Sequence, residues 1–553
     1  MATLSTQEGI SARPNILWVS LEDTSPRFGC YGDPVARTPN VDRLAQSGCR
    51  YPNAFSVAGV CAPSRSAIIT GMYPTFIGAH HMRTTHTNAA TPELPTPYET
   101  VPPPYVKAFP EYLRAAGYYC ANNKKTDYQF APPTSAWDEC GPNAHWRNRP
   151  EGVPFFAVFN PLGTHESGMW EKEESEPETD PDLVTLPPYL PDTPKARRAL
   201  ARHYDNLAIA DRQLGELLDQ LDEDGLAENT VVVLWSDHGE GLPRGKRWPY
   251  DAGIRVPLIV RWPGVIEAGS VSDELVSLID LGPSMLSLAG VDVPRHMQGR
   301  PFLGNKHEPR EYVYATRDRY DESYDMVRAV RDKRYKYIRN YFPQNPYLQW
   351  IPYRNRHPVV QEMWRLYLAG ELSEAQQAMF RFPRPPEELY DCEEDPYELN
   401  NLADSAAHRA VMARLRKALD TWREKYDVWG DVPEEQMVER MWPGKVQPTT
   451  APVVFVPIGP EADGVEPAPE GGAYKGPILV QLHCATHGAS IEYRLERDHA
   501  SADGVGTESP RWQVYTTPIR LERGAWIITT RASRIGYKVS EERAVRFRVP
   551  MAF

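Results

Sequence analysis

The feature that most constrains the fold is a set of short, continuous apolar runs, each ending abruptly in polar or charged residues. Continuous runs of Val, Ile, Leu and Phe are typical of strands buried on both faces, as in a parallel or mixed sheet covered by helices. We therefore predict an α/β fold with a mixed, mostly parallel central sheet sandwiched by helices. The runs are NILWVSLED from residue 15, GYYCANNKKTD from 117, VPFFAVFNPLGTH from 153, NTVVVLWSDHG from 229 and RVPLIVRWPG from 255.

Helical patterns lie between these runs. The segment TPNVDRLAQSG has Thr38 as its expected cap and stops at Gly48. Residues 193–225 read as one long helix capped by Thr193 and Pro194. Because strands and helices alternate, a ligand is expected at the carboxyl ends of the strands.

The pattern changes near residue 310, which predicts three structural units. Residues 1–310 carry the α/β pattern and are expected to form the catalytic domain. Residues 311–445 combine short strands with the helical segment HRAVMARLRKALDTWREKYD, which predicts an α+β subdomain with a small antiparallel sheet. Residues 446–553 alternate in β fashion around PIGPEADGVEPAPEGGAYKGP, which predicts a β-sandwich module with a linker or long loop.

Charge and composition exclude several classes of protein. The formal net charge of −13 argues against nucleic acid as a partner. No apolar run is long enough to span a membrane. The first residues, MATLSTQEGISARP, lack the features of a signal peptide, so we expect a cytoplasmic location, or a periplasmic or secreted one if a leader was removed. Seven cysteines without a C-x-x-C pair predict neither a disulfide framework nor a zinc ribbon.

Two of the apolar runs end in residues that bind metals. Glu22 and Asp23 end the first run, and Asp237 and His238 end the fourth. Carboxylate oxygens and an imidazole suit Ca²⁺, with Mn²⁺ or Mg²⁺ as alternatives. Either pair alone is equally well explained by ordinary capping or loop-solvating acids, but two such pairs at strand ends favour a divalent metal site.

Basic residues are scattered through the same region. Arg65, Lys125, His165 and Lys246 form a candidate anion pocket, although each of them alone is better explained as a solvated surface charge. Lys246 lies in GLPRGKRWPYDAGIRVP, which is locally basic within an acidic chain.

Cys61 lies just ahead of an expected helix. Pro63 fits the first turn of a helix that continues through SRSAIIT, so position 61 is near the helix N-terminus, where the pKa of a thiol is lowered. A structural cysteine and a reactive one are about equally compatible with these residues alone.

The sequence around Cys61 resembles a known family. CAPSR is the C-x-P-S-R sequence of the type I sulfatases, in which the cysteine is oxidised to formylglycine by a separate enzyme. RPNILWVSLED, IITGMYP, WSDHGEG, KRWPYDAGIRVPLIVRWPG and ELYDCEEDPYELNNLAD are similar to further segments of that family, so the resemblance covers roughly residues 13 to 430. It implies an alkaline-phosphatase-like fold, and the contexts THES and SDHGEG are most similar to the heparan N-sulfatase-like branch.

The resemblance also implies a role for each candidate residue. Residue 61 is the formylglycine nucleophile, and Arg65 supports its aldehyde hydrate. Lys125, His165 and Lys246 hold the sulfate oxygens, with His165 as the first candidate for the acid that protonates the leaving group. The implied metal ligands are Glu22, Asp23, Asp237, His238 and the modified residue 61.

Three departures from the family pattern leave details open. Glu22 stands where Asp is usual, and His238 stands where many members have Asn. Where most members read GKWHLG, this chain has NNKKTDY. Lys125 falls on the family lysine, with Lys124 as the second choice, and Asp127 replaces the usual His.

The implied reaction is covalent hydrolysis in two steps. One hydroxyl of the aldehyde hydrate attacks sulfur and displaces the alcohol or amine; the second then expels sulfate and regenerates the aldehyde. The expected substrate is a small-molecule or glycan sulfate ester or a sulfamate, and the expected partner is a formylglycine-generating enzyme. A homo-oligomer is a further expectation that the sequence leaves open. The alternatives are a formylglycine-dependent phosphonate monoester or phosphodiester hydrolase and a catalytically dead glycan-binding protein.

Overall fold

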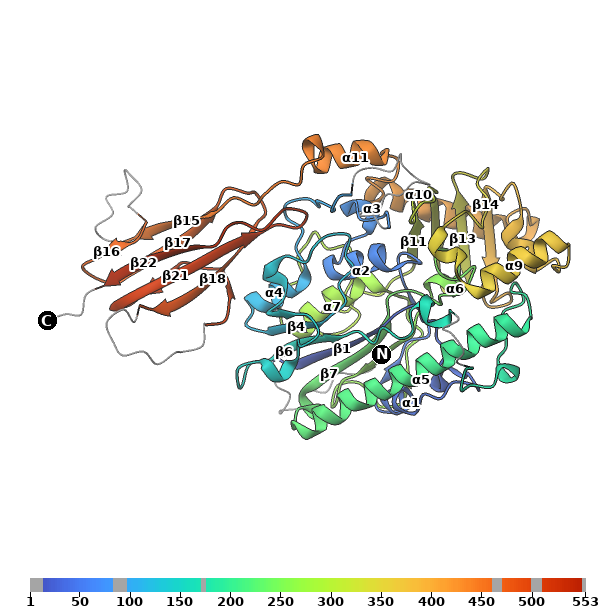
Figure 1. The fold of residues 1–553 in the computed structure, drawn as a ribbon, viewed down its shortest axis with the longest axis horizontal. Helices are drawn as coiled ribbons and strands as arrows, with labels where there is room; N and C mark the ends of the chain where they lie inside the picture. Colours follow the sequence, from blue (N-terminus) through green and yellow to red (C-terminus); the bar gives the residue numbers. More distant parts are fainter. Residues whose placement is uncertain (1–12, 83–96, 171–175, 460–469, 499–509, 550–553) are drawn as a thin grey trace.

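An eight-stranded sheet forms the centre of the catalytic part of the molecule (Figure 1). The computed structural model describes residues 13–82, 97–170, 176–459, 470–498 and 510–549. The middle strand β1 pairs in parallel with β6 and β7, whereas β8 runs antiparallel to β7, so the prediction of a mixed, mostly parallel sheet is confirmed. In spatial order the strands are β5 (Glu139–Cys140), β4 (Tyr119–Asn123), β6 (Phe155–Phe159), β1 (Asn15–Leu21), β7 (Thr230–Ser236), β8 (Leu258–Arg261), β2 (Cys49–Arg50) and β9 (Ser270–Val271).

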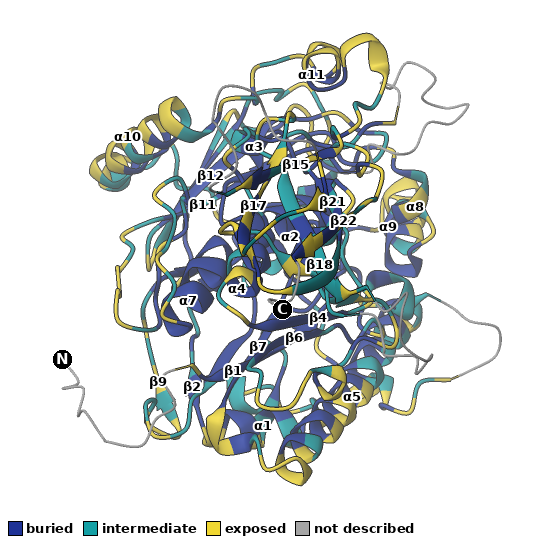
Figure 2. Cartoon of the chain, turned by 90° about the vertical axis from the view of Figure 1, so that its left-hand side faces the viewer, coloured by how far each residue is buried: buried dark blue, intermediate teal, exposed yellow. Residues whose placement is uncertain are grey.

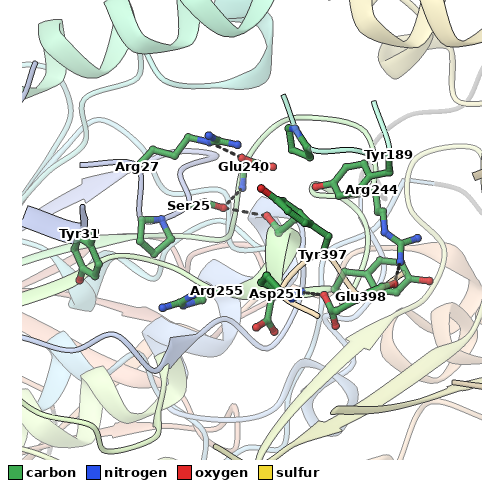
Figure 3. A pocket seen from close by; sticks show the side chains of 15 residues that line it. Ser25, Arg27, Tyr31, Tyr189, Glu240, Arg244, Asp251, Arg255, Tyr397 and Glu398 are labelled. Carbon is green, nitrogen blue, oxygen red and sulfur yellow. Dashed lines mark hydrogen bonds and ion pairs between the residues drawn. The ribbon is translucent and has the colours of Figure 1, made fainter. Parts of the chain in front are cut away.

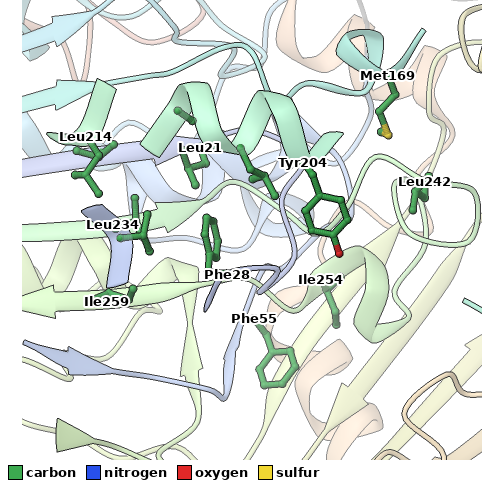
Figure 4. Packing of buried hydrophobic residues seen from close by; sticks show 14 of the residues in the cluster. Leu21, Phe28, Phe55, Met169, Tyr204, Leu214, Leu234, Leu242, Ile254 and Ile259 are labelled. Carbon is green, nitrogen blue, oxygen red and sulfur yellow. The ribbon is translucent and has the colours of Figure 1, made fainter. Parts of the chain in front are cut away.

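Helices cover both faces of this sheet (Figure 1). Successive side chains of a strand point to opposite faces, and β1 follows this rule. Leu17 and Val19 belong to the apolar cluster that includes the buried side of α5, whereas Ile16 and Trp18 belong to the cluster of α4 and α7. Figure 4 shows the α5 layer, with Leu214 lying over Leu234 and Tyr204 pointing toward Ile254. The helices are α1 (Pro39–Gln46) and α5 (Pro194–Glu223) on one face, and α2 (Cys61–Thr70), α4 (Phe109–Ala115) and α7 (Leu281–Leu288) on the other.

The predicted helix caps are confirmed in one case and wrong in the other. The hydroxyl group of Thr193 accepts a hydrogen bond from the Ala196 amide at 3.2 Å and caps α5. Thr38 precedes α1, but its side chain makes no cap; its hydroxyl accepts from the Gly29 amide at 3.1 Å instead. The Thr38 hydroxyl group therefore binds the loop before α1 and not the N–H groups at the start of the helix.

A second, antiparallel sheet follows in the chain, as predicted. Its order is β11-β12-β13-β14, and the amphipathic α10 packs on β12 and β13. The domain boundary at residue 310 stays a prediction, as does the one at 445. The elements are β11 (Val313–Arg317), β12 (Val327–Arg331), β13 (Tyr335–Asn340), α8 (Pro352–Asn355), α9 (Pro358–Ala369), β14 (Glu387–Asp391), α10 (Arg409–Tyr426) and α11 (Glu434–Met441).

The last part of the chain forms two facing sheets, the predicted β-sandwich, at one end of the molecule (Figure 1). Of the segment predicted as a linker, its first residues belong to β15, Gly472 and Ala473 form β16, and residues 460–469 lie outside the described part of the chain. The sheets are β15 (Val453–Ile458), β17 (Ile478–Cys484) and β20 (Ile519–Leu521), and β16 (Gly472–Ala473), β22 (Arg543–Val549), β21 (Gly524–Ser533), β18 (Ser490–Arg497) and β19 (Gln513–Val514).

Burial follows this layered arrangement (Figure 2). The central strands β1 and β7 are buried along their length, whereas the edge strands β5 and β9 are partly exposed and α5 and α10 expose their outer faces. Among the helices of the described residues, none is both long and apolar enough to cross a membrane.

Candidate active site

The carboxyl ends of β1 and β7 lie side by side because the two strands pair in parallel, with Leu21 opposite Ser236. The chain continues from each end with two of the predicted site residues. Backbone hydrogen bonds join the two turns, from the Thr24 amide to the His238 carbonyl at 3.3 Å and from the Asp237 amide to the Leu21 carbonyl at 3.2 Å. The sheet therefore brings two acidic strand ends together from positions more than 200 residues apart in the chain.

Four of the five predicted metal ligands converge at this edge. Ligand atoms of Asp23, Cys61, Asp237 and His238 all lie within 4.8 Å of one another, and all four side chains are buried. The Sγ atom of Cys61 lies 3.4 Å from Nε2 of His238 and 3.9 Å from Oδ1 of Asp23. This geometry places residue 61 within the same donor set as the carboxylates.

The tautomer of His238 shows that this donor set fits a cation. Its Nδ1 lies 2.9 Å from the carbonyl oxygen of Gly239, which can only accept, so Nδ1 carries a proton. Nε2 then faces Asp23 and Asp237, whose nearest oxygens lie at 3.0 and 3.8 Å. These lone pairs repel one another unless a proton or a cation lies between them. Two carboxylates and an imidazole so arranged suit a divalent metal.

Cys61 begins helix α2 and is fully buried. The helix start is tied to the strand end of β7 because the Ser64 hydroxyl group donates to the Asp237 carbonyl oxygen at 2.5 Å. The free N–H groups and the positive end of the helix dipole favour a negatively charged or strongly polar group at residue 61. The predicted position of Cys61 near a helix N-terminus is confirmed.

Glu22, the fifth predicted ligand, lies apart from the four. Its Oε1 is 2.6 Å from Nζ of Lys125 and 3.6 Å from Nη2 of Arg65. Burial alone would lower the pKa of Lys125, but the acidic groups around it raise the pKa. The neighbouring Lys124 is exposed, so of the two candidate lysines it is Lys125 that faces the site.

Arg65 lies one helical turn after Cys61 and bridges two strand ends. Its Nε donates to Oδ2 of Asp237 at 3.0 Å, and its Nη1 donates to Oδ1 of Asn160 at 3.1 Å. Asn160 follows β6 directly and was not predicted as a site residue. The guanidinium group therefore holds the Asp237 carboxylate of the metal site, and Asn160 in turn holds the guanidinium group.

Lys246 and His165 lie together against Asp23. The Lys246 ammonium donates to Oδ2 of Asp23 at 2.7 Å and lies 3.3 Å from Nε2 of His165. Burial would raise the pKa of Asp23, but Lys246, His165 and His238 hold it well below its ordinary value. The pKa of His165 is lowered, by burial first and then by Lys246. His165 follows β6 by several residues and precedes a short 3₁₀ helix, so it lies in a loop rather than at the strand end.

The sequence interpretation missed a buried ion pair that supports this group. Glu166 accepts two hydrogen bonds from Arg247, at 2.9 and 3.0 Å, and its Oε1 lies 3.2 Å from Lys246. The Glu166 amide also donates to Oδ2 of Asp23 at 2.6 Å. Both residues adjoin predicted ones, in THES and GKR, and this adjacency was the available signal.

A cavity of about 220 Å³ lies beside the loops after β1 and β7 (Figure 3). Its lining includes Arg27, Arg244 and Glu240. Arg27 is paired with Glu240 at 2.8 Å, and the Arg244 guanidinium stacks on Tyr250 and donates to the Glu398 carbonyl. Because Arg27 and Arg244 are both held by partners within the chain, the cavity gives no sign of a ligand bound at either of them.

Two family models match the chain. The model described as Sulfatase matches residues 14–138 and 142–291, and the model described as N-sulphoglucosamine sulphohydrolase, C-terminal, matches residues 239–381. Together they cover every predicted site residue.

Two relatives extend these matches. An ulvan-active sulfatase from Formosa agariphila is 40% identical, over 97% of this chain and 92% of its own length. Human N-sulphoglucosamine sulphohydrolase is 26% identical, over 78% of this chain and 94% of its own length.

Solved structures have the same fold. A 2-O GAG sulfatase matches with a TM-score of 0.58 and 20% identity, covering 75% of this chain and 93% of that one. A phosphonate monoester hydrolase from Silicibacter pomeroyi matches with a TM-score of 0.53 and 18% identity, covering 75% and 96%. At these identities the likeness concerns the fold and not the reaction.

Proposed function

The chain belongs to the sulfatase family and is a sulfuric ester hydrolase, and we propose that it releases sulfate from a glycan after Cys61 has been converted to formylglycine. The observation that carries this proposal is the burial of residue 61 at a helix start, within 3.4 Å of His238 and 3.9 Å of Asp23. Family membership implies a metal and a formylglycine in general.

The proposed metal ligands are Asp23, Asp237, His238 and residue 61. Ca²⁺ is the proposed ion because carboxylate oxygens dominate this set, with Mn²⁺ or Mg²⁺ as alternatives. The metal, when bound, supplies positive charge that activates the hydroxyl group of residue 61 and polarises a sulfate oxygen. The Glu22 carboxylate is paired with Lys125 at 2.6 Å. Glu22 can therefore bind the metal only if it gives up this ion pair.

The basic residues are proposed to bind the sulfate group. Lys125 and Lys246 carry ammonium groups on two sides of the donor set, and Arg65 orients Asp237. Such preorganised cations stabilise charge that develops on the equatorial oxygens. His165 is proposed to protonate the leaving oxygen, because its Nε2 lies 3.3 Å from Lys246 and the two groups can share a proton.

The proposed substrate is a sulfated polysaccharide or an oligosaccharide from one. The support is the 40% identity with an ulvan-active sulfatase across nearly the whole chain. The second family model favours the N-sulfatase-like branch, so sulfamate is the alternative to sulfate ester. A separate formylglycine-generating enzyme is the proposed maturation partner. A homo-oligomer stays a prediction, as does the compartment.

The test uses protein produced together with a formylglycine-generating enzyme. Mass spectrometry of the tryptic peptide from residue 51 to 65 is expected to reveal the aldehyde, and metal analysis to find a tightly bound divalent ion. Sulfate release from ulvan oligosaccharides, measured by ion chromatography, is expected to disappear in Cys61→Ala. Substantial turnover by that variant would contradict the proposal.

The same preparation separates the alternatives. Rates on an ulvan oligosaccharide, para-nitrophenyl sulfate and an aryl phosphonate monoester are compared at equal enzyme concentration. A faster reaction with the phosphonate would favour the phosphonate hydrolase alternative, and no turnover of any of the three by aldehyde-containing, metal-loaded protein would favour a glycan-binding protein.

A further inference from the structure

Two aromatic rings continue from His165 toward the surface. The Tyr353 ring, on α8, lies 6.2 Å from the His165 ring and 4.8 Å from the Trp170 ring, measured between centroids. Tyr353 is 37% exposed, and Trp170 is partly exposed. The pair is therefore open to a ligand on the side of the site where His165 lies.

Ser167 fixes these rings relative to the imidazole. Its hydroxyl group lies 2.9 Å from Nδ1 of His165, and its contact with Tyr353 opposes the rise that burial causes in the pKa of that phenol. A side chain held through such a contact loses less freedom when it binds a ligand. The position of Tyr353 is thus coupled to the residue proposed to protonate the leaving group.

Arg356 adds to the rings a positive charge that none of the described carboxylates compensates. Its guanidinium carbon lies 4.5 Å from the centroid of the Trp170 ring, and the residue is exposed. Within the described ranges, no carboxylate lies at ion-pair distance from Arg356. Arg365, on the following helix α9, is in contrast paired with Glu362 at 3.0 Å. The stacking orients the planar guanidinium group, and among the described residues no carboxylate takes up its N–H groups, which suit a carboxylate or a sulfate of a ligand.

We propose that Trp170, Tyr353 and Arg356 form a subsite for the sugar next to the sulfated one, and that Arg356 binds an anionic substituent of that sugar. This inference rests on the proposed function of the neighbouring site. The apolar faces of a pyranose ring pack on exposed aromatic rings. A polyanionic glycan also carries carboxylate or sulfate groups, which can pair with the guanidinium group of Arg356. Only a substrate longer than one sugar can use this subsite.

The test compares a long and a short substrate in Arg356→Ala and Tyr353→Ala. The long substrate is a sulfated ulvan tetrasaccharide, and the short one is para-nitrophenyl sulfate. Loss of a charge-assisted hydrogen bond is expected to raise KM for the tetrasaccharide about tenfold or more in Arg356→Ala, with kcat nearly unchanged. In the same variant, kcat/KM for the aryl sulfate is expected to stay within about twofold, because the short substrate does not reach Arg356.

Arg365→Ala is the matched control, since it removes an exposed arginine that already has a carboxylate partner. It is expected to leave both substrates unaffected. The KM of the wild type for the tetrasaccharide is expected to rise more steeply with salt than that of Arg356→Ala.

Two results would overturn the inference. Equal losses on both substrates would assign these residues a structural role, and an unchanged KM of Arg356→Ala for the tetrasaccharide would show that Arg356 binds no part of the substrate. Failure of the proposed function has a different signature, because the wild type itself would then release no sulfate from either substrate.

Discussion

At the scale of single residues, the site is a balanced set of buried charges. Asp23 is held by the Glu166 amide and by Lys246, and Glu166 is held by Arg247. Each of these side chains is at least 97% buried, so removing one partner leaves another charge without compensation. Substitutions here are therefore expected to affect stability and activity together.

Glu166→Gln tests this balance. The amide cannot neutralise Arg247 and Lys246, so we expect a loss of about 3 kcal/mol or more in the free energy of unfolding, measured with urea. We also expect a fall in kcat/KM for sulfate release, because Lys246 loses one of its two carboxylates. Glu424→Gln, at an exposed position, is the control. A stability equal to that of the control would mean that Glu166 is not needed to compensate the two cations.

Lys125 and Lys124 form a natural pair for a second prediction. Lys125→Ala is expected to lower kcat/KM about 100-fold, because it removes a cation proposed to stabilise the sulfate oxygens. Lys124→Ala is expected to change kcat/KM less than about twofold, since Lys124 is exposed. Steady-state kinetics on one sulfated substrate checks both variants. A larger loss of kcat/KM in Lys124→Ala than in Lys125→Ala would mean that Lys124, and not Lys125, binds the sulfate group.

At the scale of elements, the turn after β7 is shaped by a close approach of two backbone segments. An ideal Cβ at Gly239 would lie 2.1 Å from the carbonyl oxygen of Ala252, at the start of α6 (Asp251–Ile254). The backbone hydrogen bond from the Gly239 amide to the Gly253 carbonyl, 2.8 Å long, depends on this contact. The absence of a side chain at position 239 therefore helps to set the position of His238.

Gly239→Ala is expected to move this turn. Overpacking against Ala252 should cost about 2 kcal/mol in the free energy of unfolding. Bound metal per chain, measured by mass spectrometry of the metal, should also fall because His238 is displaced. Gly476→Ala, where a Cβ meets no atom within 4 Å, is the control. Unchanged metal content in Gly239→Ala would contradict this account of the turn.

At the scale of the whole molecule, the β-sandwich is joined to the catalytic part by buried ion pairs. Arg114 of α4 lies 2.8 Å from Glu492 of β18 and 3.1 Å from Asp138, and the side chains of Arg114 and Glu492 are at most 1% exposed. Arg511 reaches the same Asp138 from the sandwich side at 2.5 Å. These contacts favour a module that is part of the folded unit rather than a tethered one.

Arg114→Ala is expected to weaken this junction, because Glu492 stays buried with one cation fewer. We expect the module to unfold at a lower temperature than the catalytic part, so that a single calorimetric transition separates into two. Arg520→Ala, on the exposed side of the sandwich, should leave the transition unchanged. A single unshifted transition in Arg114→Ala would assign the junction to apolar packing instead.

Buried histidines predict a loss of stability in acid. Burial lowers the pKa of His203 to about 4, and that of His357 likewise to about 4. The unfolded chain binds these protons near pH 6.5 and the folded chain does not, so stability is complete above pH 6.5 and falls as the pH drops toward 4. His203→Gln should reduce the slope in this window by up to about 1.4 kcal/mol per pH unit, measured by urea unfolding at several pH values.

Much of the fold was predictable because it depends on local or periodic features. Strands buried on both faces require continuous apolar runs, and this alone led to β1, β4, β6, β7 and β8. The start of α2 at Cys61 followed from Pro63 and the residues around it. The site lay at the strand ends for the same reason, since parallel strands bring their carboxyl ends to one edge.

The sequence by itself therefore determined the layered α/β fold, the edge that carries the site and the family to which the chain belongs. Only the tertiary structure decided which charged side chains form ion pairs with each other. The positive φ of Lys124 turns the chain so that Lys125 faces Glu22, and the order of strands brings Glu166 to Arg247 across 81 residues of sequence. Trp170 and Tyr353 lie still farther apart in the sequence, yet their rings are in contact. The physical reason is that periodicity records burial along one element, whereas ion pairs and ring contacts depend on where distant elements pack.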